Sequence, residues 1–493
     1  MKNISFEKLV FFVLRNKWLI VIVFLGLFLR LYKIETIFNY GHDHDLASWI
    51  VKDVLVNKHP RLIGQQTSTL GIFIGPYWYY TLIPFYILFA MDPIAIAYQS
   101  AFIGAIAIIS CYFVFGKLIE KQAGLIAALL YSISFFMINN DREGVPTTPV
   151  ILWTIWGIYV IYLFLKGKEK KVFVFAGILT GLIWHLNFAL VFYVPVWCMA
   201  YLMTKKDYAI RDYINGIIAL IITSFPLLLF ELRHGFIQVK SLLFSLWQDQ
   251  GDTVYLGIEK YKRVIFLINK NFSNLFSGGL LGFNNEIALV LIIILFLYFL
   301  TRKILDKKLI FSFFVLFSLF VLFFSNYSKT VSEYYLNGIT LLSFFGLVLL
   351  CNEIIKRSKR YGLVFLGFVF AINMWVYIQS PPSGNGYKYR KEVINAIKHD
   401  MIANNYSCSG ISYLTDPGYD LGYRYFMWRE DIHVAKISED VPVYSIVYPL
   451  RDYFIVDNLF GSIGIIKPNR QDPATINCGD NINVTEPLFG YTQ

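Results

Sequence analysis

Two short polar segments carry the residue types needed for acid–base and phosphate chemistry. HDHDLASWIVKDVL, at residues 42–55, alternates two histidines with two aspartates. NNDREGVPTTP, at residues 139–149, places Arg142 between two acids. A positioned carboxylate can remove a proton from a reacting hydroxyl, and the planar guanidinium of arginine can bind two phosphate oxygens at once. Both segments are therefore candidates for a catalytic or binding site.

The neighbouring sequence indicates different roles for the two aspartates of the first segment. The apolar residues behind them share a spacing that predicts an amphipathic helix: Leu46, Ala47, Ile50, Val51, Val54 and Leu55. Asp45 directly precedes this helix and could cap it by accepting its free N–H groups, or it could assist catalysis. Asp43 has no such local role, so we predict that Asp43 is a general base.

A divalent metal ion is a second possibility for the same segment. His42 and His44 could face one side of an extended chain, with Asp43 or Asp45 completing the ligand shell. This spacing is not that of a known structural metal site. Hydrogen bonds from the histidines to substrate or to loop backbone are the interpretation that we favour, and the sequence requires no cofactor.

The composition places these segments beside a membrane. Of the 493 residues, 57% are hydrophobic and 16% are charged, against about 45–50% and about 25% in soluble domains. The net charge of +11 comes from Lys and Arg in short loops between apolar runs, which follows the positive-inside rule and does not indicate a nucleic-acid partner. We predict a polytopic α-helical protein of the cytoplasmic (plasma) membrane with a cytoplasmic N-terminus.

Apolar runs that alternate with the basic loops predict about eleven transmembrane helices and an exported C-terminus. The expected spans are 18–38, 94–116, 122–138, 148–165, 172–187, 188–203, 212–230, 286–300, 309–325, 334–350 and 361–379. Residues 71–90 are apolar, but Gly75, Pro76 and Pro84 should break a helix there, which favours an interfacial or re-entrant element. The helix behind Asp43 should lie along the membrane with its stripe in the interface. The outer loops would be 39–93, 139–148, 231–285 and 326–333.

The character of the chain changes near residue 381. The linker PPSGNGYKYR is followed by one helix pattern and by short apolar runs such as YSIVYPL, which predict strands. We therefore expect a membrane domain at residues 1–380 and a small extracytoplasmic α/β domain at 381–493. Cys408 and Cys478 both fall in the second domain, where a disulfide can persist, although their spacing does not show that they are close.

The layout resembles the GT-C superfamily of membrane glycosyltransferases, and within it the protein O-mannosyltransferases and the aminoarabinose transferases of lipid A. The acidic first loop and the second polar loop carry the resemblance. Three further segments add to it: GPYWYY (75–80), GILTGLIWHLN (177–187) and KTVSEYYLNG (329–338). The sequence departs from the family where the usual Asp-Glu pair is Asp43 and Asp45, where a lysine is replaced by Gly75, and where Thr147 stands in place of a carboxylate. These departures leave the phosphate contacts and any metal open.

The resemblance implies a donor sugar carried on polyprenyl phosphate, an acceptor on the outer face, and contact with membrane lipids. Asp43 would deprotonate the acceptor hydroxyl, and direct attack would invert the anomeric centre; Asp141 or Glu143 remain possible as a second, nucleophilic carboxylate. Arg142 would bind the donor phosphate, with an internal ion pair as the alternative. Other donor-site candidates, each with an ordinary packing or headgroup role as its alternative, are Arg61, His185, Asn187, Lys329, Glu333, Tyr334 and Tyr335.

Two other classes of function fit the same composition. A transporter or flippase of a lipid-linked substrate should place charged groups at the membrane midplane, whereas the spans expected here are almost free of charge. A polymerase or ligase of cell-envelope glycans would share the donor and differ only in its acceptor. The sugar and the acceptor cannot be identified from the residues.

Overall fold

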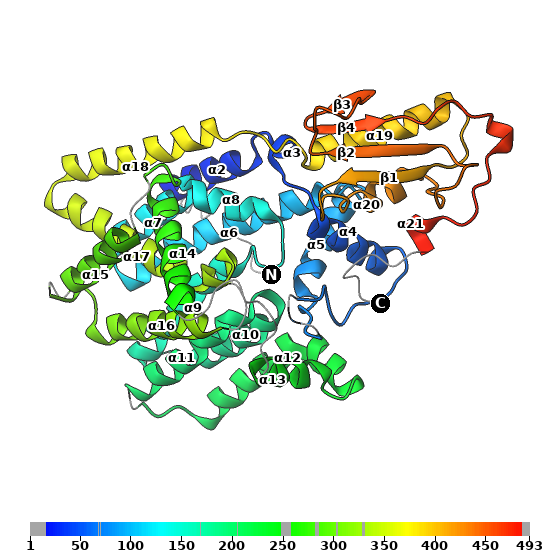
Figure 1. Cartoon of the computed structure of the whole chain (residues 1–493). Coiled ribbons are helices and arrows are strands. Elements are labelled where there is room, and N and C mark those ends of the chain that lie inside the picture. Colours follow the sequence, from blue (N-terminus) through cyan, green and yellow to red (C-terminus); the bar gives the residue numbers. More distant parts are fainter. Residues whose placement is uncertain are drawn as a thin grey trace, which may run out of the picture.

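The computed structural model describes residues 16–67, 69, 71–167, 169–204, 206–247, 258–281, 285–301, 304–327 and 331–485. Helices form one body, and a small sheet lies at one end of it (Figure 1). Five described helices are long and apolar enough to cross a membrane, namely α6 (Ala95–Leu118), α12 (Ile210–Arg233), α16 (Lys307–Asn326), the continuous segment Glu333–Arg357 that ends in α17 (Asn337–Arg357), and α18 (Lys359–Gln379).

Shorter helices occupy the remaining expected spans. They are α2 (Lys17–Leu31), α7 (Lys121–Ile133), α9 (Val150–Lys166), α10 (Val172–Leu186), α11 (Tyr193–Leu202) and α15 (Asn285–Thr301). The count rises to six spans if α7 and α8 (Phe135–Glu143) are one bent crossing. The figure of about eleven spans therefore stays a prediction, while the polytopic helical class is confirmed.

One expected span is broken in the structure. Residues 122–138 were expected to be continuous, but α7 ends at Ile133 and α8 begins at Phe135 with a bend of 64°. Ser134 between them has an extended backbone. Asn373 of α18 accepts the freed N–H of Phe135 through its side-chain oxygen at 2.9 Å, so the break costs no hydrogen bond on that side.

A buried ion pair lies where the broken span meets the first one. Arg30, in the last turn of α2, and Asp141, on α8, are both inaccessible to solvent, and their nearest charged atoms are 2.8 Å apart. Arg30 also donates to the carbonyls of Tyr131 and Ser132, near the end of α7. A side chain at Gly104 would lie 2.4 Å from Asp141 Oδ2, so this glycine leaves the space that the pair occupies.

Arg142 makes the reciprocal contact at the end of α2. Its guanidinium donates to the carbonyls of Leu29, Arg30 and Tyr32 and to the hydroxyl of Tyr377. The last carbonyls of a helix have no partner within the helix, and a nearby cation satisfies them. Arg30 thus donates to the last carbonyls of α7, and Arg142 donates to the last carbonyls of α2. Together these contacts hold α8 against α2.

The juxtamembrane elements also differ from expectation. Helix α5 (Tyr77–Leu88) occupies the 71–90 segment and contains Pro84 instead of ending there. Helix α4 (His42–Leu55) begins at His42, before the aspartates, and is buried on nearly every side from His44 to Val51. Its stripe therefore does not lie in the lipid interface, because the C-terminal domain covers the helix. The loop 231–285 contains α13 (Ile237–Trp247) and α14 (Ile258–Ser277).

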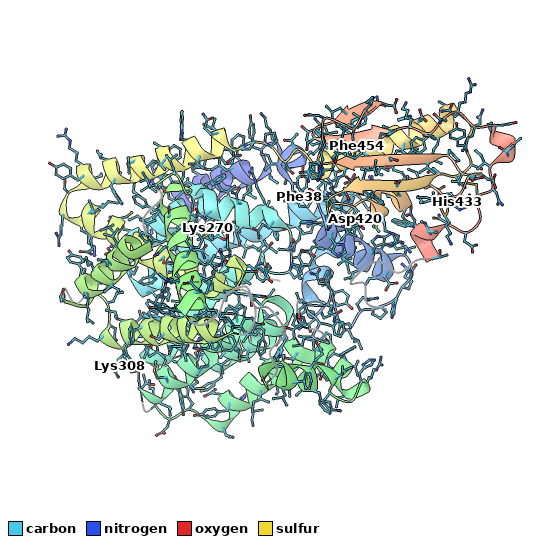
Figure 2. The ribbon with its side chains drawn as sticks, viewed as in Figure 1. Phe38, Lys270, Lys308, Asp420, His433 and Phe454 are labelled. Carbon is cyan, nitrogen blue, oxygen red and sulfur yellow. A yellow bond between two sulfur atoms is a disulfide. The ribbon has the colours of Figure 1, made fainter. Side chains whose placement is uncertain are left out.

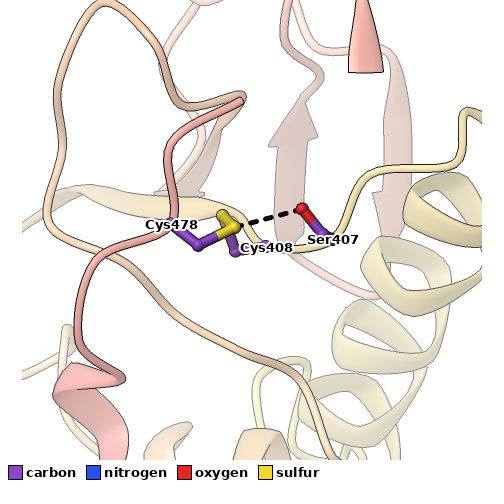
Figure 3. Close-up of a disulfide and its surroundings, with 3 residues drawn as sticks. All are labelled: Ser407, Cys408 and Cys478. Atoms are coloured by element: carbon purple, nitrogen blue, oxygen red, sulfur yellow. Dashed lines mark hydrogen bonds between the residues drawn. A yellow bond between two sulfur atoms is a disulfide. The ribbon is translucent and has the colours of Figure 1, made fainter. Parts of the chain in front are cut away.

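The C-terminal region forms the expected α/β arrangement. Its four strands have the order β1 (Gly410–Thr415), β2 (Val443–Tyr448), β4 (Ile463–Ile466), β3 (Asn458–Phe460). β1 and β2 are parallel, whereas β4 is antiparallel to both of its neighbours. Helix α19 (Tyr387–Ala403) and the short α20 (Arg424–Arg429) and α21 (Ile482–Thr485) complete it. Cys408 and Cys478 form a disulfide (Figure 3).

One hydrophobic core joins this region to the segment that holds α4 and α5. It combines residues of α4 and α5 with residues of α19, α20 and the sheet. At its edge the buried Asp92 accepts hydrogen bonds from Tyr387 at 2.6 Å and Lys391 at 2.8 Å, and it pairs with Arg429 at 2.9 Å. The boundary near residue 381 is thus a boundary in sequence, but the packing is continuous across it.

We predict that Asp141→Asn lowers the free energy of unfolding by about 3–5 kcal/mol, because it leaves the Arg30 charge buried without its partner. Thermal unfolding in lipid nanodiscs would measure this. Asp43→Asn is the matched control, since the same substitution at an exposed site should change the midpoint little. Equal midpoints for the two variants would show that the ion pair does not hold α2 and α8 together.

Candidate functional site

Asp43 lies in the first turn of α4 with its side chain exposed to solvent. Gln65 donates to its Oδ1 at 3.4 Å. Its carboxylate lies close enough to Tyr79 and Tyr334 to interact with both electrostatically. The structure therefore presents Asp43 to water, among polar groups from three separate segments of the chain.

Asp45 points the opposite way, into the core. It is fully buried and accepts hydrogen bonds from the backbone N–H of Tyr425 at 3.1 Å and from the Tyr40 hydroxyl at 3.2 Å. The interpretation of Asp45 as the helix cap was wrong, because the helix starts earlier and Gly41 is its N-cap. Its position also removes Asp45 from the surface on which a substrate could meet Asp43. Burial raises the pKa of Asp45 to about 6.

His44 joins the segment that follows α2 to the end of α8. Its Nδ1 accepts from the backbone N–H of Gly41 at 3.0 Å, and its Nε2 contacts the backbone carbonyl of Glu143. A neutral ring with the proton on Nε2 satisfies both contacts, and burial lowers the pKa of His44 in favour of that neutral form. Both ring nitrogens are thereby occupied, which contradicts the use of His44 together with His42 as metal ligands.

The structure offers no alternative metal site in the part of the chain that it describes. No group of three or more His, Cys, Asp or Glu side chains there is placed to hold a metal ion. The interpretation of the histidines as hydrogen-bonding residues of the loop backbone fits His44.

Glu143 is the second carboxylate of the candidate site. It ends α8, beyond the bend at Ser134, and its side chain is exposed to solvent. The carboxyl groups of Asp141 and Glu333 lie close enough to Glu143 to interact with it electrostatically. Its neighbour Asp141 is not accessible, because it is paired with Arg30. Of the two acids in this loop, Glu143 alone can meet a substrate.

The arginines expected to bind phosphate are engaged elsewhere. Arg142 donates to helix-terminal carbonyls, as described above, and Arg61 is buried with its Nη1 3.0 Å from Asp53 Oδ2. Lys329 lies outside the described residues. The internal ion pair offered as the alternative for Arg142 is not formed either, because its guanidinium donates to backbone carbonyls and to the Tyr377 hydroxyl.

Lys270 is a cation that the sequence analysis did not single out. It projects from α14 and forms an ion pair with Glu333, and both side chains are about half exposed (Figure 2). Helix α14 contacts both α8 and the short helix η2 (Glu333–Leu336). The alternation of polar and apolar residues in 258–277 could have indicated this helix, but not which of its lysines faces the site.

The other candidates hold the site together. Asn187 donates to the backbone carbonyl of Tyr334 at 3.2 Å. Tyr335 stacks on Phe324, with ring centroids 5.6 Å apart. His185 is buried and stacks on Tyr77 at 4.2 Å. These residues tie the late outer loop and the juxtamembrane segment to the helices, and Tyr334, partly exposed, is the one nearest to Asp43.

Comparisons with known proteins agree with this architecture. Residues 75–230 match the family model described as Dolichyl-phosphate-mannose-protein mannosyltransferase. ArnT from Cupriavidus metallidurans bound to undecaprenyl phosphate is similar in structure, with a TM-score of 0.58 and 9% identity over 92% of this chain and 98% of that chain. Its apo state gives a TM-score of 0.58 and 8% identity over 94% of this chain and 99% of that chain. No curated protein sequence matches.

These similarities confirm the resemblance found in the sequence. The chain has the fold of the GT-C superfamily of membrane glycosyltransferases: a polytopic helical body with a small C-terminal sheet domain. It is an integral membrane protein.

The buried carboxyl of Asp45 makes stability depend on pH. Its pKa is about 6 in the folded protein and 3.8 when exposed, so the folded state holds a proton that the unfolded state releases first. Wild-type stability should therefore fall as pH rises from about 4 to about 6, by up to about 3 kcal/mol from this group. Asp45→Asn, which keeps the acceptor oxygen, should lose that contribution. Thermal midpoints of the two proteins between pH 4 and 8 would test this, and parallel curves would contradict it.

Proposed function

We propose that this protein is a glycosyltransferase that moves a sugar from a polyprenyl-phosphate carrier to an acceptor hydroxyl on the outer face of the membrane. The observation that carries the proposal is that two accessible carboxylates, Asp43 and Glu143, lie on segments joined by His44, and that Lys270 pairs with Glu333, which interacts electrostatically with Glu143. The similar structure of ArnT, which holds undecaprenyl phosphate, supports a donor of this kind.

The proposed reaction is a direct displacement. Asp43 removes the proton of the acceptor hydroxyl as its oxygen attacks the anomeric carbon, and the bond from that carbon to the phosphate breaks. The polyprenyl phosphate leaves with the bonding electrons, and the anomeric centre inverts. A retaining reaction would need a second carboxylate on the opposite face of the sugar, and Glu143 is the remaining candidate for that role.

His44 and Lys270 would support this chemistry in different ways. Because His44 binds the backbone carbonyl of Glu143, it holds the segment that carries Asp43 beside the segment that carries Glu143. Lys270 would neutralise the donor phosphate, exchanging its contact with Glu333 for a phosphate oxygen. The N-terminus would then lie in the cytoplasm, with the site and the sheet domain outside.

A flippase of a lipid-linked substrate is the second candidate. The five long apolar helices contain few charged residues, and the buried Arg30–Asp141 pair is closed by carbonyl groups. Neither feature provides a polar route across the membrane, which favours chemistry at the surface.

We expect Asp43→Asn to reduce transfer by about 10²–10⁴-fold, the usual contribution of a general base. The assay would use protein in nanodiscs, a panel of radiolabelled polyprenyl-phosphate sugars and a crude cell-envelope acceptor, with unfolding midpoints as the control. Equal transfer by wild type and variant would exclude Asp43 and move the role to Glu143, to be tested with Glu143→Gln. Uptake of donor into sealed vesicles without any transfer would support the flippase.

We further expect Lys270→Ala to raise the KM for the donor about tenfold or more, since it removes a charge-assisted contact to phosphate. Lys270→Arg should retain most of the affinity. Lys262→Ala is the matched control, because Lys262 lies on the same helix and pairs only with Glu259 among the contacts described. A Lys270→Ala variant that behaves like the control would remove Lys270 from the donor site.

A further inference from the structure

The loop that follows β2 has large apolar side chains that are exposed to solvent. In residues 449–457, here called the apolar loop, Tyr453 is 67% exposed and Ile455 is 90% exposed, and Leu459 just beyond it is 57% exposed. Several large exposed apolar side chains in one loop are typical of a surface that contacts a partner or a membrane. The loop is otherwise firmly placed, because Leu450 and Val456 pack over Gly464 of β4.

The strand register places the apolar loop at one particular end of the domain. It follows the last residue of β2, and Val447 near that end is paired with Gly464 at the start of β4. Directly before β4, Ser462 donates its N–H to the carbonyl of Gly384 at 2.9 Å. Only residues 380–383 separate Gly384 from the end of α18, an apolar helix long enough to cross the membrane.

A second tether fixes the same end of the domain to the first span. The N–H of Tyr387 donates to the carbonyl of Phe38 at 3.0 Å, and Phe38 follows directly after the short helix behind α2. Figure 2 shows Phe454 of the apolar loop at the end of the domain nearest the helices, whereas His433 lies at the far end. The loop is therefore held close to the C-terminal ends of two apolar helices, α2 and α18, of which α18 is long enough to cross the membrane.

The composition of the loop suits a lipid interface. Tyrosine prefers the headgroup depth of a bilayer, with its ring in the apolar boundary and its hydroxyl in the polar layer. Arg451 donates to the Tyr453 hydroxyl at 3.1 Å and pairs with Asp416 at 2.8 Å, so the cation sits directly beside the exposed ring. Moving the exposed Ile455 side chain from water into lipid lowers the free energy, because it removes apolar surface from water.

We propose that the apolar loop dips into the outer surface of the bilayer, so that Tyr453 and Ile455 contact lipid and anchor the sheet domain to the membrane. The domain is then held at three places: by the shared core with α4 and α5, by the tethers at Gly384 and Phe38, and by lipid. This contact does not depend on the proposed reaction.

The experiment labels Ile455→Cys with an environment-sensitive fluorophore in the full-length protein, in a Cys198→Ser background that removes the exposed native thiol. Ile437→Cys is the matched control, since Ile437 is also an exposed isoleucine of this domain (54%) but lies against Gly410 at the opposite end of the sheet. Both proteins would be placed in nanodiscs, with unfolding midpoints confirming that each is folded.

We expect a spin label on lipid chains near the headgroups to quench the fluorophore at 455 at least about twofold more than the one at 437, because such quenching needs near contact with lipid. Aqueous iodide should show the reverse order. If both labels are quenched by iodide alike and neither by lipid, the loop lies in water and the proposal is overturned; its apolar surface would then be open to a protein or glycan.

Discussion

The buried pair of Arg30 and Asp141 is the constraint on which the arrangement of the site depends. Two opposite charges in a poorly polarisable interior must stay together, because separating them leaves an unpaired charge away from water. The pair joins the C-terminal end of α2 to α8, and Arg142, which follows Asp141, donates to the carbonyls at that same end of α2. Glu143 is the next residue, so its position is set by two buried arginines, Arg30 and Arg142.

The helical class and the separate sheet region could be predicted because they follow from apolar length and from strand periodicity, which are local properties. The break at Ser134 could not, since it depends on Asn373 of another helix accepting the freed N–H of Phe135. The burial of α4 could not be predicted either. An amphipathic stripe shows that a helix has an apolar side, but not whether lipid or a domain almost four hundred residues later will cover it.

In the candidate site, too, some features could be predicted from the sequence and others could not. Residue type was enough to single out the two polar segments, but not to show that His44 joins them by a hydrogen bond. Arginine is a common phosphate ligand, which made Arg142 and Arg61 candidates. In the structure Arg142 donates to backbone carbonyls and Arg61 pairs with Asp53. Neither contact can be inferred from the sequence. Lys270 lacked any local signal because its partner, Glu333, lies in another segment of the chain.

The core shared by α4, α5 and the sheet domain bears on how such a protein can be recombined. A modular domain can be exchanged between relatives at its linker, but here the linker near residue 381 separates two halves of one interior. A chimera joined there would place the α4 surface of one protein against the aromatic face of another. To transplant the sheet region intact, residues 34–92 would have to travel with it, although they lie at the other end of the gene.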